Sequence, residues 1–265
     1  MQGIHQHNSL FKVRSGQLLK NQYGILLLEY MLAMVIGLSM VLFIFEVHRC
    51  LKASHRFIQS VYLAFNEAET LITLINQEVH AAGRMGCEKI NEQHLVYDST
   101  QQIFRAIFPL TLSEHAIRLM HTDAGYVLLL VDAAKGHAAL RAAESLSLRR
   151  GDWIIISDCI HTELTRVANV YTHAKHEQTI HLEKPLHFAF KKSAMIAKFV
   201  IVDINTRKRH AIEIVSLTVN GSRTAIAEYI ENLTFYLIGS RAIHYEFDVA
   251  IGGIHKKWYG YAAQQ

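Results

Sequence analysis

The longest apolar run of the chain lies near its N-terminus. From Ile25 to Phe45, 21 successive residues contain a single charged side chain, Glu29. A helix of about 20 apolar residues crosses the hydrocarbon core of a bilayer, so this run predicts a transmembrane helix over residues 25–45. A carboxylate within such a span costs on the order of 2–3 kcal/mol. Glu29 is therefore a candidate functional residue, and the alternative is a boundary residue tolerated near the headgroups.

The hydrophobic pattern continues beyond the span at helical spacing. Apolar residues recur every three or four positions, and polar side chains occupy the positions between them. Such a stripe indicates an amphipathic helix with one face packed against a domain. Since no Gly or Pro occurs between Gly37 and Gly83, we expect one helix over residues 25–82 that stops at Gly83. The stripe consists of Val47, Leu51, Ile58, Val61, Phe65, Ala68, Ile72, Ile75 and Val79.

From about Leu95 the pattern changes to short runs rich in β-branched and aromatic residues, which predict strands. Asn220-Gly221 lies between two of these runs and is a hairpin signal, while Gly252-Gly253 indicates a bend. Residues 83–265 are therefore expected to form an antiparallel β-rich domain, and the fold class is α+β. The predicted strands are Tyr126–Val131, Trp153–Ser157, Arg166–Tyr171, Thr179–Leu182, Phe199–Ile204, Ile212–Val219, Ala225–Ile230 and Ile243–Val249.

Composition and charge add little to this picture. The chain of 265 residues is 51% hydrophobic and 19% charged, so it can bury a core. Its net charge of +4 is spread along the sequence. The basic clusters Arg149-Arg150, Lys191-Lys192 and Arg207-Lys208-Arg209 lack interleaved aromatic residues, and we expect no nucleic-acid partner.

Histidines, cysteines, serines and glycines, the residues typical of metal sites and catalytic loops, form no recognisable motif in this chain. The chain has 17 histidines, and five of them fall in one region: His161, His173, His176, His181 and His187. No His-Glu-x-x-His, Cys-x-x-Cys, Gly-x-Ser-x-Gly or phosphate loop is present. We expect solvated or singly hydrogen-bonded histidines, no metal, no cofactor and no enzymatic activity.

The three cysteines, Cys50, Cys87 and Cys159, have two interpretations. In a reducing compartment all three would be thiols, whereas in an oxidising one two could pair and one would remain.

Gly24 followed by Ile-Leu-Leu-Leu-Glu resembles the type IV prepilin signature. In that signature a Gly precedes an apolar residue, and Glu is the fifth residue after the cleavage point. The resemblance implies that residues 1–24 are a leader peptide, that prepilin peptidase cleaves between Gly24 and Ile25, and that the new amine of Ile25 is N-methylated. It also implies that Glu29 pairs with this amine on an adjacent subunit. The chain departs from the pattern in having Ile25 and Leu26 in place of Phe-Thr, and Asn21-Gln22-Tyr23 in place of basic residues before Gly24.

Three further segments resemble those of PilW-like minor pilins. They are residues 82–87, which end in Met-Gly-Cys, residues 151–159, which end in Ser-Asp-Cys, and residues 227–236, which contain Glu-Asn-Leu. The resemblance implies a pilin-like fold and a disulfide between Cys87 and Cys159, with Cys50 left without an assigned role. It further implies a single-pass protein of the inner membrane with a periplasmic domain that enters the pilus. There it would prime or support assembly near the tip, with the major pilin and other minor pilins as partners.

Two other classes of protein remain open at this stage. A minor pseudopilin of type II secretion shares the helix and the signature. A single-span periplasmic binding or sensor protein would keep residues 1–24, which a pilin loses. An enzyme would require a pocket with convergent polar groups.

Overall fold

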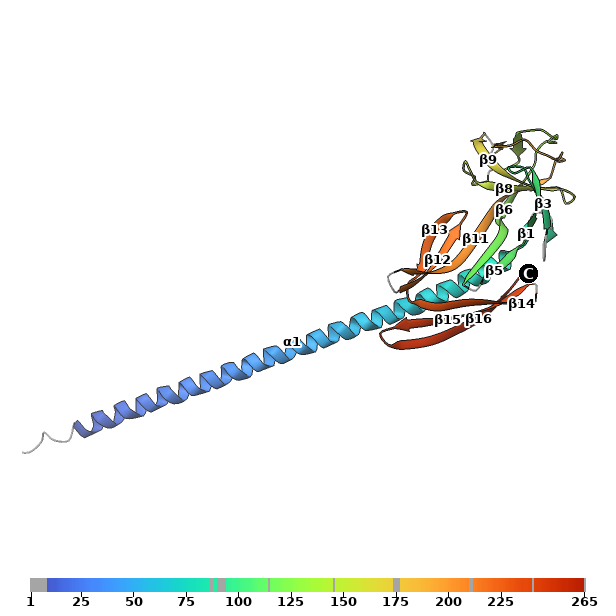
Figure 1. The fold of residues 1–265 in the computed structure, drawn as a ribbon. Coiled ribbons are helices and arrows are strands. Elements are labelled where there is room, and N and C mark those ends of the chain that lie inside the picture. The colour runs from blue at the N-terminus through green and yellow to red at the C-terminus, as the bar shows by residue number, and fades with distance from the viewer. Residues whose placement is uncertain are drawn as a thin grey trace, which may run out of the picture. The chain divides into compact units, whose positions relative to one another are not determined.

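The computed structural model describes residues 9–264 except 86–87, 90–93, 114, 145, 174–176, 210–211 and 240 (Figure 1). The chain divides into two units, Met1–Gln59 and Ser60–Gln265. The helix α1 (Ser9–Ala81) contributes to both units, and the strands β1–β16 belong to the second. The α+β class expected from the sequence is thus confirmed.

Helix α1 ends where the sequence predicts. Its last residue is Ala81, and Gly83 follows with a φ of 82°, a conformation that glycine adopts without steric cost. The N–H of Gly83 then donates to the Met120 carbonyl at 3.0 Å. The helix begins at Ser9 and so includes residues 9–24, which the sequence prediction assigns to a leader.

Only the C-terminal part of the predicted apolar stripe is buried. Of the predicted stripe, Ala68, Ile75 and Val79 are 0% exposed, and residues 61, 65 and 72 are half-buried. Ala64 and Leu71, which the prediction did not include, are also 0% exposed and complete the buried line of the helix. The prediction was wrong for the beginning of the stripe, because residues 47, 51 and 58 are exposed. Periodicity shows which face of a helix is apolar, but it does not show where the packing partner begins.

An antiparallel sheet of three strands covers one side of this buried helical segment. The strands are β14 (Ile230–Ile238), β15 (Ala242–Ile251) and β16 (Ile254–Ala263), in that order. Their buried residues join those of α1, β6, β11 and β12 in one hydrophobic core, so the helix lies between two sheets (Figure 1).

The second sheet is larger and has eleven described strands. Its main path runs β13-β12-β11-β8-β9-β10-β7, and β3, β4, β5 and β6 branch from it. The separate two-residue strands β1 (Arg84–Met85) and β2 (Glu88–Lys89) pair with each other. The bounds are β3 (His94–Asp98), β4 (Ile103–Ile107), β5 (Leu110–Ser113), β6 (Ala116–Leu128), β7 (Ala139–Ala142), β8 (Trp153–Ser157), β9 (Thr162–Thr172), β10 (Gln178–Leu182), β11 (Met195–Arg209), β12 (Ile212–Val219) and β13 (Ser222–Ala227).

Seven strands of the large sheet follow one another in a path whose two end strands, β4 and β5, are joined through the chain and not by a described strand pairing; we call this path the ring. The pairings run β4–β3–β9–β8–β11–β6–β5, and only Phe108 and Pro109 separate β5 from β4 along the chain. One pairing, between β3 and β9, is parallel. A small cluster of buried apolar residues fills the ring: Met85, Val96, Ile107, Ile155, Leu164, Ala197 and Phe199.

The turn predictions are confirmed, and several strands were missed. Asn220 and Gly221 both have positive φ, at 49° and 87°, and join β12 to β13 in the conformation that a tight hairpin requires. Gly252 and Gly253 join β15 to β16 in the same way. Strands β1 to β5, β7 and β16 were not predicted, and the predicted strand 225–230 is divided between β13 and β14.

Candidate functional site

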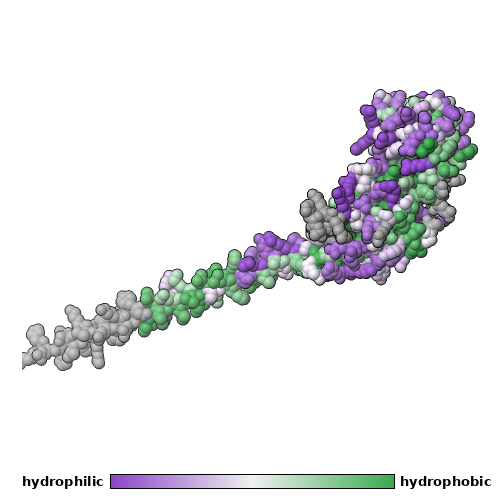
Figure 2. Space-filling view, viewed as in Figure 1, coloured by the Kyte–Doolittle hydropathy of each residue, from purple (hydrophilic) through white to green (hydrophobic). Residues whose placement is uncertain are grey.

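The first candidate site is the exposed apolar surface of α1. All residues from Ile25 to Gln59 are exposed, and the large apolar side chains of residues 25–45 range from 48% exposed at Ile36 to 71% at Leu28. Within the described residues this helix is long and apolar enough to cross a membrane. Figure 2 shows the hydrophobic surface next to the grey N-terminal residues, followed by a hydrophilic stretch. Such a surface must be covered by lipid or by other apolar chains.

Glu29 is the one charge on this surface between residues 25 and 45. It lies on the exposed helix, one turn after Ile25, so the two side chains share a face. Within the described part of the chain, Glu29 has no hydrogen bond or ion pair. Its carboxylate is thus available to a group from outside this chain.

Gly24 and Ile25, the residues of the predicted cleavage site, both lie within the helical backbone of α1. The Ile25 side chain is 59% exposed. The peptide bond between them precedes the exposed apolar run directly, so cleavage there would leave that run at the new N-terminus.

The cysteines were predicted to pair as Cys87 with Cys159. Cys159 is disulfide-bonded, and Cys50 is a free, exposed thiol on α1. Cys87 lies outside the described residues, so the pairing stays a prediction.

The turn that carries Cys159 is built by Asp158. The Asp158 carboxylate accepts hydrogen bonds from the N–H groups of Ile160 (3.0 Å) and His161 (2.7 Å). Partial burial raises the pKa of Asp158, but these bonds and the nearby His161 outweigh it, and the net pKa lies below its usual range. The anionic Asp158 holds Cys159 at a φ of 69° between β8 and β9.

The region rich in histidines forms no metal site among the described residues. His187 stacks on Tyr97 with ring centroids 3.9 Å apart, and His161 stacks on Phe188 at 4.7 Å. His173 contacts the Thr179 hydroxyl at 2.9 Å. His176 lies outside the described residues.

A histidine that the sequence did not single out joins the helix to the large sheet. His121 of β6 is 8% exposed, and its Nε2 lies 2.8 Å from the Glu78 carboxylate of α1. Burial lowers the pKa of His121, but the hydrogen bond and charge of Glu78 and the Thr122 carbonyl outweigh it, and the net pKa is raised. Nothing in the local sequence signals this pair, because 43 positions separate its members.

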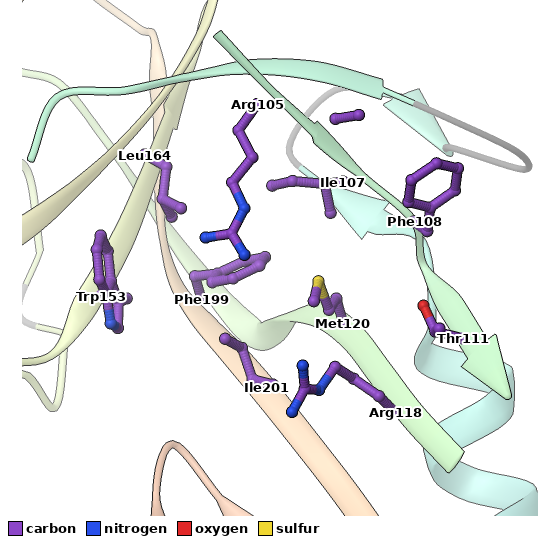
Figure 3. Close-up of a pocket in the computed structure, with 11 residues that line it drawn as sticks. Arg105, Ile107, Phe108, Thr111, Arg118, Met120, Trp153, Leu164, Phe199 and Ile201 are labelled. Atoms are coloured by element: carbon purple, nitrogen blue, oxygen red, sulfur yellow. The ribbon is translucent and has the colours of Figure 1, made fainter. Parts of the chain in front are cut away.

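The second candidate site is a pocket of about 200 Å³ at the mouth of the ring (Figure 3). Apolar side chains from β4, β6, β8, β9 and β11 line it, together with Phe108, and two arginines, Arg105 and Arg118, border it. The sequence did not predict this pocket, because β4 and β5, the two end strands of the ring, were not predicted. The alternation of apolar and polar residues in Leu110-Thr111-Leu112-Ser113 is a strand signal that could have indicated β5.

The two arginines of the pocket differ in their partners. Arg118 forms a bidentate ion pair with Asp203, at 2.7 and 3.1 Å, and this bond raises the pKa of Arg118. Arg105 is exposed and has no hydrogen bond or ion pair with any described residue. The pocket is therefore apolar within and positively charged at its border.

No protein-family model matches the chain, and no curated protein matches it. The class of the protein consequently rests on its own residues and geometry.

Proposed function

We propose that this chain is a minor type IV pilin of the PilW-like kind, a non-enzymatic subunit that primes or supports pilus assembly. The observation that carries the proposal is the division of α1 into two halves. Residues 25–59 are exposed throughout, whereas residues 64–82 supply a line of buried side chains to the core of the β-rich domain.

The exposed half of the helix fits a subunit that moves from membrane to filament. Each large apolar side chain removed from water contributes about 1.5–3 kcal/mol. A bilayer supplies this environment before assembly, and the helices of neighbouring subunits supply it afterwards. The same surface thus holds the subunit in the inner membrane as a single-pass protein before assembly. In the pilus it packs against the major pilin and other minor pilins.

Glu29 would give the assembled helices their register. After cleavage by prepilin peptidase, each subunit begins with a positively charged, methylated amine at Ile25. A carboxylate in an apolar setting is costly unless a cation neutralises it. Pairing with the Ile25 amine of an adjacent subunit meets this need, and Glu29 is available because it has no partner within the described part of its own chain.

The disulfide bond of Cys159 in the β-rich domain supports a periplasmic location. A disulfide at Cys159 persists in an oxidising compartment. The exposed apolar helix precedes this domain in the chain, as expected for a membrane anchor followed by a periplasmic domain.

The mature N-terminus tests the class of the protein. In cells with active prepilin peptidase, mass spectrometry of the membrane fraction should find methylated Ile25 as the first residue, and peptidase-deficient cells should retain the leader. A Gly24→Val variant should remain unprocessed. A first residue upstream of Ile25 in peptidase-active cells would indicate a permanent single-span anchor and contradict the proposal.

Recovery in sheared pili tests the role of Glu29. Glu29→Ala should reach the same cellular level as the parent and be depleted from the pilus fraction. Glu46→Ala is the matched control, because Glu46 lies on the same helix, is exposed, and pairs with Arg49 at 3.4 Å in its own chain. Equal recovery of both variants at equal levels would refute the assembly mechanism.

A further inference from the structure

We propose that the pocket at the mouth of the ring binds a small organic carboxylate that carries one apolar group. This inference concerns the β-rich domain and is independent of the apolar helix, so failure of one proposal leaves the other unchanged.

The inner wall of the pocket is apolar, and buried side chains from three strands form it. Ile107, Leu164 and Phe199 are 3%, 4% and 1% exposed, respectively, and belong to the buried cluster inside the ring. Each comes from a different strand, namely β4, β9 and β11, and each strand is held by its ring neighbours. The wall is therefore formed before any ligand arrives, which reduces the entropic cost of binding.

Strand registers place the polar groups on the same face as this wall. Arg105 is directly opposite Val96, a residue of the buried cluster, in the β3–β4 register. Arg118 is directly opposite Thr111 in the β5–β6 register, and both line the pocket. Opposite residues in an antiparallel pair project to the same side of the sheet. Figure 3 accordingly shows the Arg105 side chain extending from β4 into the pocket.

The charge at the pocket is positive and only partly compensated. Arg118 is neutralised by Asp203, whereas Arg105 has no partner among the described residues. A third guanidinium, that of Arg166, lies 5.2 Å from the ring centroid of Trp153, another lining residue. No carboxylate belongs to the lining residues. A ligand with a negative charge complements this arrangement.

The volume of the pocket limits the size of the apolar group that the ligand carries. A volume of about 200 Å³ is below the range of roughly 300–1,000 Å³ typical of drug-sized ligands. The pocket therefore accepts one aromatic or branched group. Guanidinium groups bind carboxylates in a bidentate planar geometry. An aryl or branched-alkyl carboxylate satisfies both the apolar wall and Arg105.

Binding can be measured through Trp153. The chain has two tryptophans, and Trp258 stacks on Phe247 away from the pocket lining. Replacing Trp258 with Phe leaves Trp153 as the reporter. The full chain in detergent micelles is titrated with 3-phenylpropionate and with the neutral 3-phenylpropanamide. We expect the carboxylate to bind at least about tenfold more tightly than the amide, because only the carboxylate forms charge-assisted hydrogen bonds.

Two charge variants identify the group responsible. Arg105→Gln should lower the carboxylate affinity to that of the amide. Lys135→Gln removes the same charge from an exposed position outside the pocket lining and should change neither affinity. Since both variants share the same micelles, partition of the probe into detergent cancels in the comparison. Absence of saturable binding, equal affinity for the two probes, or an equal loss in both variants would overturn the proposal.

Discussion

Substitution of Gly260 by alanine should destabilise the β-rich domain through one specific contact. Gly260 of β16 is directly opposite Tyr245 of β15, and the Tyr245 ring covers the glycine. A Cβ atom at residue 260 would lie 2.4 Å from both Cζ and Oη of Tyr245. These distances are far below van der Waals contact, so the ring must move.

The ring has little freedom to move. Tyr245 is 1% exposed within the core that contains α1, and its hydroxyl donates to the Asn76 side chain of α1 at 3.3 Å. Overpacking a buried site costs about 1–3 kcal/mol, and loss of a hydrogen bond costs about 0.5–1.5 kcal/mol. Replacing glycine in a strand recovers roughly 0.5–1 kcal/mol of chain entropy. The net expectation is a destabilisation of about 1–3 kcal/mol.

Thermal unfolding of the full chain in detergent, followed by near-UV circular dichroism, measures this loss. Gly125→Ala is the matched control, because its nearest contact, Leu146 Cδ2, would lie at an acceptable 3.8 Å. In a Tyr245→Leu background the cost of Gly260→Ala should shrink, which gives a double-mutant cycle. A Gly260→Ala protein as stable as the parent, or a cost unchanged by Tyr245→Leu, would refute the reasoning.

Three other measurements follow from described contacts. The folded-state pKa of His121 is raised above its ordinary 6.5, so the ion pair with Glu78 stabilises the fold fully below pH 6.5 and this stabilisation is lost as pH rises through the folded pKa. The difference in melting temperature between the parent and His121→Gln should therefore shrink from about pH 5.5 to about pH 8.5. A difference that stays constant with pH would contradict this. Leu71→Ala, at a 0% exposed site, should cost about 2–5 kcal/mol in thermal unfolding, whereas Leu63→Ala, at a 52% exposed site, should cost less than about 0.5 kcal/mol. Thiol labelling of denatured, unreduced protein should modify Cys50 and leave Cys159 unmodified until a reductant is added; labelling of Cys159 without reduction would reject its disulfide.

The sequence by itself determined the features that depend on neighbouring residues. Helix α1 follows from an uninterrupted run without Gly or Pro between residues 37 and 83, and its end follows from Gly83. Strand β8 was predicted at its exact bounds, Trp153–Ser157, and the turn at Asn220-Gly221 was predicted from two residues. The exposed apolar run and its single carboxylate, Glu29, are equally a property of the sequence.

Tertiary structure alone decided the features that join distant segments. The burial of α1 begins at Ala64 because the β-rich domain packs there, although the apolar stripe begins at Val47. The ring requires Tyr97 of β3 to pair with Glu163 of β9. These two residues are far apart in the sequence, and no local pattern encodes such a contact. The pocket at Arg105 exists only in the folded domain, since its lining residues come from six strands, β4, β5, β6, β8, β9 and β11, whose order is set by long-range hydrogen bonding and shared burial.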